Sequence, residues 1–169
     1  MNDFGAQAIL VIPRLRRYAR ALTGGRSPSD DLVQDTLERA WAKRHLWRPG
    51  SDLRAWMFTI MHNVYVNQVR ARVAEVTVSL DQEAYDVPAR SNPADLLEVA
   101  DIDNALRRLP DEQREVLLLV ALEQLSYTDT ANALGIPVGT VMSRLYRARE
   151  RLRVLLGSAN AAGVLKVVK

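Results

Sequence analysis

The stretch that decides the fold is residues 109–152, LPDEQREVLLLVALEQLSYTDTANALGIPVGTVMSRLYRARERL. Within it, Ser126 precedes a short helical pattern, and Asp129 three residues later completes a capping box. Gly135 follows that pattern and supplies the left-handed residue with which many helices end. Pro137 then favours the start of a second helix. Two helices joined by so short a turn predict a helix-turn-helix.

The second helix of this motif is expected to offer one face to the protein and the other to DNA. Val141 and Leu145 are one turn apart and should both face inward. Short polar groups near the helix start suit base edges, and arginines further along suit phosphates or guanine. The candidate DNA-facing residues are Thr140, Ser143, Arg144, Tyr146, Arg147 and Arg149. The alternative is an ordinary helical hairpin with a charged outer face.

Charge is unevenly distributed along the 169 residues. Residues 1–74 carry twelve Lys or Arg against six acids, residues 75–103 carry eight acids and one arginine, and residues 138–153 carry five arginines and one acid. Clustered positive charge is typical of nucleic-acid binding, although a solvated charged surface is the alternative explanation for each cluster.

The composition excludes several classes of protein. The absence of cysteine excludes disulfides, zinc fingers and thiol chemistry. The two histidines, His45 and His62, have no accompanying nucleophile, metal-ligand set or phosphate loop, so no enzyme site, metal or cofactor is expected. The longest apolar run, residues 116–122, is far shorter than the roughly 20 residues of a membrane helix. A cytoplasmic protein without membrane insertion is the default.

Helical signals continue through the N-terminal half. Ser27 as cap and Pro28 as first residue predict the start of one helix. Residues 53–64 carry an apolar stripe that predicts a second helix. A further helix is expected over residues 10–22, bent or begun near Pro13.

The aromatic residues of this half divide into two groups. Trp41, Trp56 and Phe58 stand at helical spacing and are expected in the core. Trp47 stands near Pro49 in a loop, and the sequence supports two interpretations of it: a stacking surface or a core residue. Residues 74–95 lack a sustained period and are read as an acidic linker, and the chain after Gly157 as a fraying tail.

Two stretches together resemble a known family. Residues 21–72, ALTGGRSPSDDLVQDTLERAWAKRHLWRPGSDLRAWMFTIMHNVYVNQVRAR, resemble region 2 of the bacterial sigma-70 family in its extracytoplasmic-function (ECF) form. Residues 108–120, RLPDEQREVLLLV, and residues 125–152, LSYTDTANALGIPVGTVMSRLYRARERL, resemble region 4 of the same family. Both matches stand in the family's order, with no domain between them.

The resemblance implies an all-α fold of two small helical domains joined by a flexible linker. Region 2 is expected over residues 1–74 and region 4 over residues 96–156. The acidic linker then spans residues 75–95, and a disordered tail spans residues 157–169.

The resemblance also implies a polymerase-binding surface on the helix of region 2. Asp31, Gln34 and Asp35 match the surface that binds the clamp helices of the largest subunit of core RNA polymerase, and region 4 would meet the flap of the second-largest subunit. Carboxylate and amide groups one turn apart suit basic residues on a partner helix. The alternative is plain helix capping, which is expected of Asp30 in any case.

The loop and helix that follow resemble the part of the family that captures a base flipped from the promoter −10 element. An extruded base needs stacking surfaces and a polar pocket. Trp47 and Arg48 are the candidate surfaces, and Asn63 matches the polar position beside the pocket, where its amide both donates and accepts. Arg70 and Arg72 are candidates to hold backbone phosphates.

The −35 readers of the family map onto four positions in the predicted helix-turn-helix: Met142, Ser143, Tyr146 and Arg147. Met142 departs from the family, where Arg or Lys is usual, and a thioether makes no bidentate bond to guanine. Arg147 therefore becomes the stronger candidate for base readout.

Together these matches predict a promoter-specificity subunit of RNA polymerase without catalysis of its own. Its partners would be core polymerase, promoter DNA and an anti-sigma factor that covers both lobes. The alternative is a stand-alone helix-turn-helix regulator, which would need a dimer and a two-fold symmetric site. No heptad run supports that dimer, and an enzyme is the least supported class.

Overall fold

The structure, a computed structural model, describes the backbone of residues 3–78 and 95–167, and the side chains of residues 3–77 and 101–157. Every regular element in these ranges is helical, as the sequence predicts. The N-terminal unit consists of α1 (Phe4–Thr23), α2 (Arg26–Ala42), the short turn η1 (Arg44–Leu46) and α3 (Leu53–Val78). The C-terminal unit consists of α4 (Asp95–Arg107), α5 (Asp111–Leu117), the π-helical turn η2 (Leu118–Leu122), α6 (Tyr127–Leu134) and α7 (Val138–Val167).

The N-terminal unit is a three-helix bundle with an aromatic core. Leu15 and Leu22 of α1 and Leu32 of α2 are almost completely buried. Tyr18 packs edge-on against Phe58 of α3, with ring centroids 5.1 Å apart. Burial of this kind provides most of the stability of helices as short as these.

The C-terminal unit wraps α4, α5 and α6 around the first half of α7. Val116 and Leu119 lie on one side of its core, and Val141 and Leu145 of α7 on the other, all at most 2% exposed. The apolar run at residues 116–122 therefore belongs to the core: residues 116–119 are buried, and residues 120–122 are partly buried against them.

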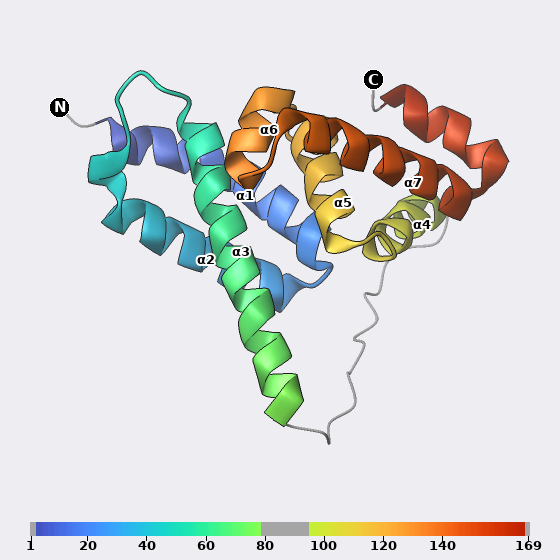
Figure 1. The fold of residues 1–169 in the computed structure, drawn as a ribbon, viewed down its shortest axis with the longest axis horizontal. Helices are drawn as coiled ribbons and strands as arrows, with labels where there is room; N and C mark the ends of the chain where they lie inside the picture. The colour runs from blue at the N-terminus through green and yellow to red at the C-terminus, as the bar shows by residue number, and fades with distance from the viewer. Residues whose placement is uncertain (1–2, 79–94, 168–169) are drawn as a thin grey trace.

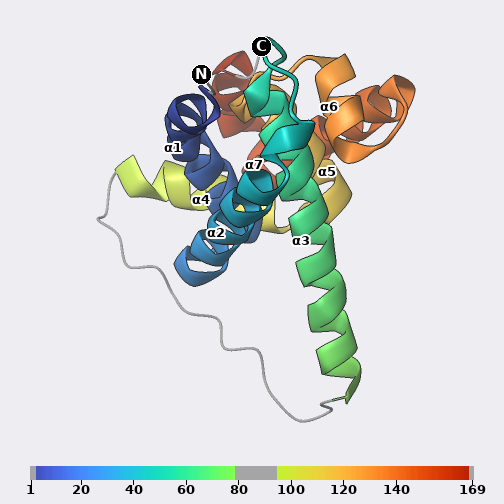
Figure 2. The ribbon, with the colours of Figure 1, turned by 90° about the vertical axis from the view of Figure 1, so that its left-hand side faces the viewer.

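The two units pack against each other. α6 and η2 meet α3 and α1 respectively, and α4 lies against α1 (Figures 1 and 2). The described structure is thus a closed arrangement of two helical units. The two helical domains expected from the sequence are both present, and apolar residues of both belong to one buried cluster.

Helix α3 extends further than its apolar stripe predicts. It reaches Val78 and projects below the rest of the molecule (Figure 1). Residues 75–78 of the expected linker are therefore helical, and residue 95 begins α4. Residues 79–94 of that linker lie outside the described residues.

Two helix starts differ from the sequence prediction. α2 begins at Arg26, so Ser27 is inside the helix and caps nothing; Gly25 is the residue at the N-cap. α1 begins at Phe4, six residues before the expected start at residue 10; the Phe4 ring is buried, and Pro13 is accommodated within the helix.

The predicted tail is also helical. α7 continues to Val167, with one break at Gly157, whose φ of 74° and ψ of 161° are not helical. The expected disordered tail over residues 157–169 is corrected accordingly as far as Val167. Glycine alone adopts this backbone conformation without strain, and the alanines that follow favour helix.

Candidate nucleic-acid and polymerase interfaces

The turn of the predicted helix-turn-helix forms as its sequence indicates. The Ser126 side chain accepts a hydrogen bond from the backbone N–H of Asp129 at 3.0 Å. Gly135 adopts the left-handed conformation with φ 65°, and its N–H donates to the carbonyl of Ala131. The Ser126 cap and the glycine stop are therefore confirmed, and they fix where α6 begins and ends. The Asp129 carboxylate accepts from the Ser126 hydroxyl at 2.8 Å, so the reciprocal bond of a capping box, to the Ser126 backbone N–H, is replaced by one to its side chain.

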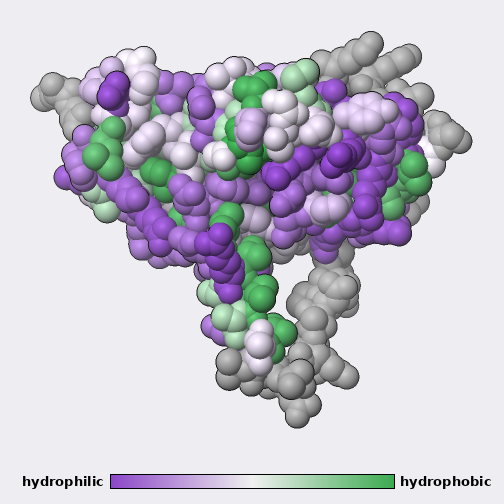
Figure 3. Space-filling view, viewed as in Figure 1, coloured by the Kyte–Doolittle hydropathy of each residue, from purple (hydrophilic) through white to green (hydrophobic). Residues whose placement is uncertain are grey.

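Helix α7 separates an inner face from an outer face. Val141 and Leu145 face the core, as predicted. Most of the candidate −35 readers are exposed, and hydrophilic residues gather over this part of the surface (Figure 3). The exposed members are Met142, Ser143, Tyr146 and Arg147.

The remaining candidates on α7 are less exposed to solvent. Thr140 and Arg149 are half-buried. Arg144 is also half-buried, and its guanidinium lies 3.4 Å from the carboxylate of Glu112 on α5. Arg144 therefore has an intramolecular partner that a phosphate would have to displace.

The candidate polymerase-binding residues lie on the outer face of α2. Asp31, Gln34 and Asp35 are all exposed. Asp35 accepts a hydrogen bond of 2.8 Å from Gln68 of α3, and Gln34 donates to Glu38 at 3.2 Å. Asp30 is exposed and does not cap α2, contrary to expectation, because the helix begins four residues before it.

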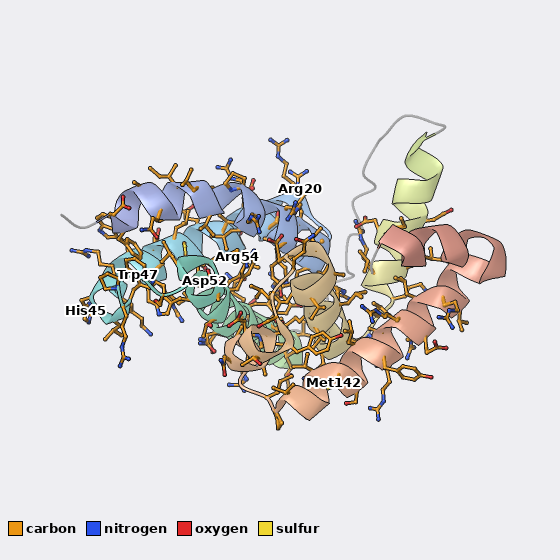
Figure 4. All side chains as sticks on the ribbon, turned by 90° about the horizontal axis from the view of Figure 1, so that it is seen from above. Arg20, His45, Trp47, Asp52, Arg54 and Met142 are labelled. Carbon is orange, nitrogen blue, oxygen red and sulfur yellow. The ribbon has the colours of Figure 1, made fainter. Side chains whose placement is uncertain are left out.

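Two tryptophans near the C-terminal end of α2 differ in exposure. Trp47 is buried, with its ring centroid 5.8 Å from that of Phe4, and so it offers no stacking surface in this structure (Figure 4). Trp41, expected in the core, is 56% exposed. The cause is α1, whose first turn covers Trp47; Trp56 and Phe58 pack in the core as predicted.

The other candidate −10 residues are accessible. Asn63 is exposed on α3, and Arg70 and Arg72 are exposed further along the same helix. Arg48 is exposed in the loop before α3. This loop ends at Asp52, whose carboxylate accepts a hydrogen bond of 3.2 Å from the N–H of Ala55.

Charged residues connect the two units, and no short-range signal in the sequence indicates them. Glu123, completely buried, accepts a 2.9 Å hydrogen bond from Arg17 of α1. Arg54 of α3 donates to the Glu123 carbonyl at 3.1 Å. His62 of α3 lies 2.7 Å from Glu115 of α5. The paired residues lie 53 to 106 positions apart in the sequence, so only the tertiary structure brings them together.

Arg114 forms the most extensive of these connections. It is buried, and it donates to four backbone carbonyls: those of Leu22, Leu106, Arg107 and Leu109. Since Leu22 belongs to α1, one side chain binds the turn before α5 to the N-terminal unit. From the sequence alone, Arg114 is one arginine in an amphipathic helix, and none of these hydrogen bonds is predicted.

A cavity of about 430 Å³ lies between α3 of the N-terminal unit and the C-terminal unit. Apolar residues line it from both sides, with Arg70, Arg144 and Glu112 among its charged residues. Burial, with a smaller contribution from Asp111, raises the pKa of Tyr65 in this cavity to about 12. Burial also raises the pKa of Tyr18 beneath it, so both phenols stay neutral at ordinary pH.

Comparison with known proteins identifies the family. The profile described as the Sigma2 domain of PhyR matches residues 10–62, and that described as Sigma-70, region 4 matches residues 100–152. The chain is 40% identical to the ECF RNA polymerase sigma factor EcfG of Rhodopseudomonas palustris, over 88% of the chain and 82% of the relative. The chain belongs to the ECF RNA polymerase sigma factors. An ECF sigma factor of Mycobacterium tuberculosis, SigL, is 37% identical over 84% of this chain and 82% of its own.

Solved structures of ECF sigma factors share the fold. The sigma factor RpoE of Bartonella quintana, in complex with the anti-sigma factor NepR, matches with a TM-score of 0.78 and 40% identity, covering 92% of this chain and 98% of that one. CnrH, in complex with the cytosolic domain of CnrY, matches with a TM-score of 0.68 and 29% identity, covering 92% and 88%. Both support the arrangement of two helical units.

The described residues contain neither a membrane-spanning helix nor a metal-binding cluster. No helix in these ranges is long and apolar enough to cross a bilayer. Within the same ranges, no group of three or more His, Asp or Glu side chains is arranged to hold a metal ion.

Proposed function

We propose that this ECF sigma factor binds core RNA polymerase, recognises −35 and −10 promoter elements, and assists strand separation at the start site. The observation that carries the proposal is that one chain exposes two different nucleic-acid-suited faces. One is the recognition helix α7, and the other is the Asn63 side of α3. A stand-alone repressor would bind duplex DNA through its helix-turn-helix and would not require the face of α3 that carries Asn63.

The C-terminal unit would read duplex DNA. An α-helix fits the major groove, and the exposed Arg147 is the candidate for a bidentate bond to guanine. Ser143 and Tyr146 would contact base edges or phosphates from the same face. Met142 would contribute only apolar contact, for example to a thymine methyl group.

The N-terminal unit would hold the separated strand. Asn63 would bind the edge of an extruded base, while Arg48, Arg70 and Arg72 would neutralise phosphates. Since Trp47 is buried, the stacking surface for that base must come from another group unless the loop rearranges.

Core polymerase would bind the exposed face of α2 through Asp31, Gln34 and Asp35. The flap of its second-largest subunit would meet the C-terminal unit. The closed arrangement of the two units would then open, so that each DNA-binding face reaches its own promoter element.

An anti-sigma factor is the proposed regulator. The similar sigma factor RpoE was solved in complex with the anti-sigma factor NepR, and CnrH in complex with the cytosolic domain of CnrY. In this chain the cavity between α3 and the C-terminal unit has residues from both units, so a partner bound there would hold them together.

The test is transcription from a promoter that core polymerase alone does not use. The purified chain with core polymerase should initiate at a −35/−10 promoter. Asn63→Ala should impair opening more than docking, whereas Arg147→Ala should weaken duplex binding by roughly 1–3 kcal/mol. Arg151→Ala, an exposed arginine on the same helix, is the control for loss of charge alone.

The outcomes separate the hypotheses. No binding to core polymerase would contradict a sigma factor, and specific footprinting of a palindrome by the chain alone would favour the stand-alone regulator. Equal effects of Asn63→Ala and Arg147→Ala on docking and opening would contradict the division of work between the two units.

A further inference from the structure

Glu123, just after η2, is a buried carboxylate that is only partly matched by the donors around it. Its side chain is 0% exposed. Arg17 of α1 donates to one carboxylate oxygen, Oε1, through two N–H groups, Nε at 3.2 Å and Nη2 at 2.9 Å. The other oxygen, Oε2, accepts no hydrogen bond within the described residues, and the Arg14 guanidinium lies 3.9 Å from it. A carboxylate can accept on both oxygens, so half of its capacity is unused.

Three arginines of the N-terminal unit surround this carboxylate, and we call them the arginine cluster: Arg14, Arg17 and Arg54. Their side chains are 46%, 52% and 27% exposed, so solvent reaches them although Glu123 is buried. Arg54 donates to the Glu123 backbone carbonyl at 3.1 Å and lies 3.6 Å from the carboxylate of Asp52 at the start of α3 (Figure 4). Each guanidinium has five N–H donors, so Glu123 uses only part of what the cluster offers.

The surroundings of the arginine cluster favour an anion with more charge and more oxygens than a carboxylate. Helix α1 contains four arginines and no acidic residue, and Arg16 and Arg20 are exposed beside the cluster residues. Without Glu123, three guanidinium groups would face one carboxylate, that of Asp52. Guanidinium forks match phosphate oxygens in a bidentate geometry, so a phosphate group fits this set of donors.

The contact of Glu123 with the cluster also joins the two units, since Glu123 belongs to the C-terminal unit and the arginines to the N-terminal unit. The attraction within a buried ion pair is largely offset by the cost of removing both charges from water. Such a contact adds little net stability and can be exchanged for a better anion at low cost. An anion that replaces Glu123 would therefore remove one of the connections between the units.

We propose that Arg14, Arg17 and Arg54 form a phosphate-binding site that the Glu123 carboxylate fills in the closed arrangement, and that a competing phosphate group releases the C-terminal unit from α1. The phosphate belongs either to a nucleic-acid backbone or to a small phosphorylated molecule. The site is separate from the candidate −10 face. Asn63 follows Arg54 by nine positions, about two and a half turns, and so lies on the opposite side of α3.

The experiment measures the separation of the units by energy transfer between two dyes. Since the chain has no cysteine, Ala42→Cys on α2 and Asn132→Cys on α6 introduce two exposed labelling sites. The probes are sodium pyrophosphate and a short oligothymidylate, and sodium chloride at equal ionic strength is the salt control. Each phosphate probe that enters the site should lower the energy transfer of the wild-type chain.

Three variants connect this response to the arginine cluster. Arg17→Ala should weaken the binding of the phosphate probes by about tenfold or more, because it removes charge-assisted hydrogen bonds. Arg16→Ala, the loss of an exposed arginine next to it in the chain, is the matched control and should respond like the wild type. Glu123→Gln should lower the energy transfer before any probe is added, since a neutral amide attracts the arginines less strongly.

A second measurement uses the wild-type chain and does not depend on how Arg17→Ala folds. The Nε–H resonance of Arg17, assigned with Arg17→Lys, should shift in the NMR spectrum as pyrophosphate is added and should reach saturation. An Arg17 resonance that stays unchanged while the probe binds would overturn the proposal.

The outcomes decide both the site and the source of the phosphate. Responses to both probes that Arg17→Ala loses support a site open to small phosphorylated molecules. A response to the oligothymidylate alone, also lost in Arg17→Ala, supports the site and assigns it to a nucleic-acid backbone. An equal response to sodium chloride would show charge screening only, and binding unchanged by Arg17→Ala would place the site elsewhere; either result overturns the proposal. No measurement includes polymerase, so these results are independent of the proposed function.

Discussion

The turn between α6 and α7 and the loop between α2 and α3 both connect helices that carry candidate DNA-binding residues, but different forces fix them. The α6–α7 turn is held by its own residues, with the Ser126 cap at one end of α6 and the left-handed Gly135 at the other. The α2–α3 loop is held by α1, whose Phe4 ring lies 5.8 Å from that of Trp47.

This difference determines how each region responds to change. A turn fixed by hydrogen bonds within four residues forms wherever its sequence occurs. A loop fixed by a helix forty residues away depends on the whole bundle. The Phe4 ring lies near both tryptophans, but only Trp47 is buried, while Trp41 stays exposed.

The largest expected effect separates the two tryptophans. Trp47→Ala removes a buried ring and should lower the free energy of unfolding by about 3–5 kcal/mol. Trp41→Ala changes an exposed side chain and should cost only about 0.5 kcal/mol. Urea unfolding followed by circular dichroism measures both changes in the free energy of unfolding. Equal losses of stability would contradict the difference in burial between Trp47 and Trp41.

The next effect concerns the connection between the units. Arg114→Met removes one donor from each of the carbonyls of Leu22, Leu106, Arg107 and Leu109, and it should cost about 3 kcal/mol or more. The Leu106 carbonyl keeps a second donor, the N–H of Leu109. Arg108→Met, an exposed arginine close by in the chain, is the control. A loss no greater than that of the control would mean that Arg114 contributes little to the closed arrangement.

A smaller and more local effect is expected in the helix-turn-helix. Ser126→Ala removes the side-chain cap of α6 and should cost about 1 kcal/mol. Faster amide exchange should appear in α6, while α2 and its loop stay unchanged. Ser143→Ala is the control, since that hydroxyl only donates to the Thr140 carbonyl within α7. Faster exchange throughout both units would contradict a locally determined turn.

The last effect, which appears only at high pH, is a pH dependence of stability at the contact between the units. Because burial raises the pKa of Tyr65 from 10.0 to about 12, its contribution to stability is complete below pH 10.0 and is lost as the pH rises through about 12. Tyr65→Phe should therefore reduce the fall in the urea midpoint over this range. Part of the fall should remain, since the pKa of Tyr18 is raised as well. An unchanged pH profile would place Tyr65 outside the buried contact.

Much of the fold could be predicted from sequence patterns. The helical class, the helix-turn-helix, the inward positions Val141 and Leu145, and the family all follow from periodicity, caps and motifs. Helix ends were less predictable: Ser27 looks like a cap, yet α2 begins before it, and the tail after Gly157 forms further helix. Local propensity does not decide such ends when neighbouring packing extends a helix.

The candidate sites divide in the same way. The exposed positions Asn63 and Arg147 follow from motif matches, and their roles stay proposals. The positions of Trp41 and Trp47 did not follow, because helical spacing alone does not show which side α1 covers. The partners of Glu123 and Arg114 were also beyond sequence reasoning, since they lie in the other unit.

The sequence by itself determined the helical units, the recognition helix and the family, because capping, glycine conformation and apolar periodicity act over a few residues. Only the tertiary structure decided which tryptophan is exposed, which charges connect the units, and that they pack together. Burial and ion pairing depend on what lies opposite a side chain, and that neighbour comes from distant parts of the chain.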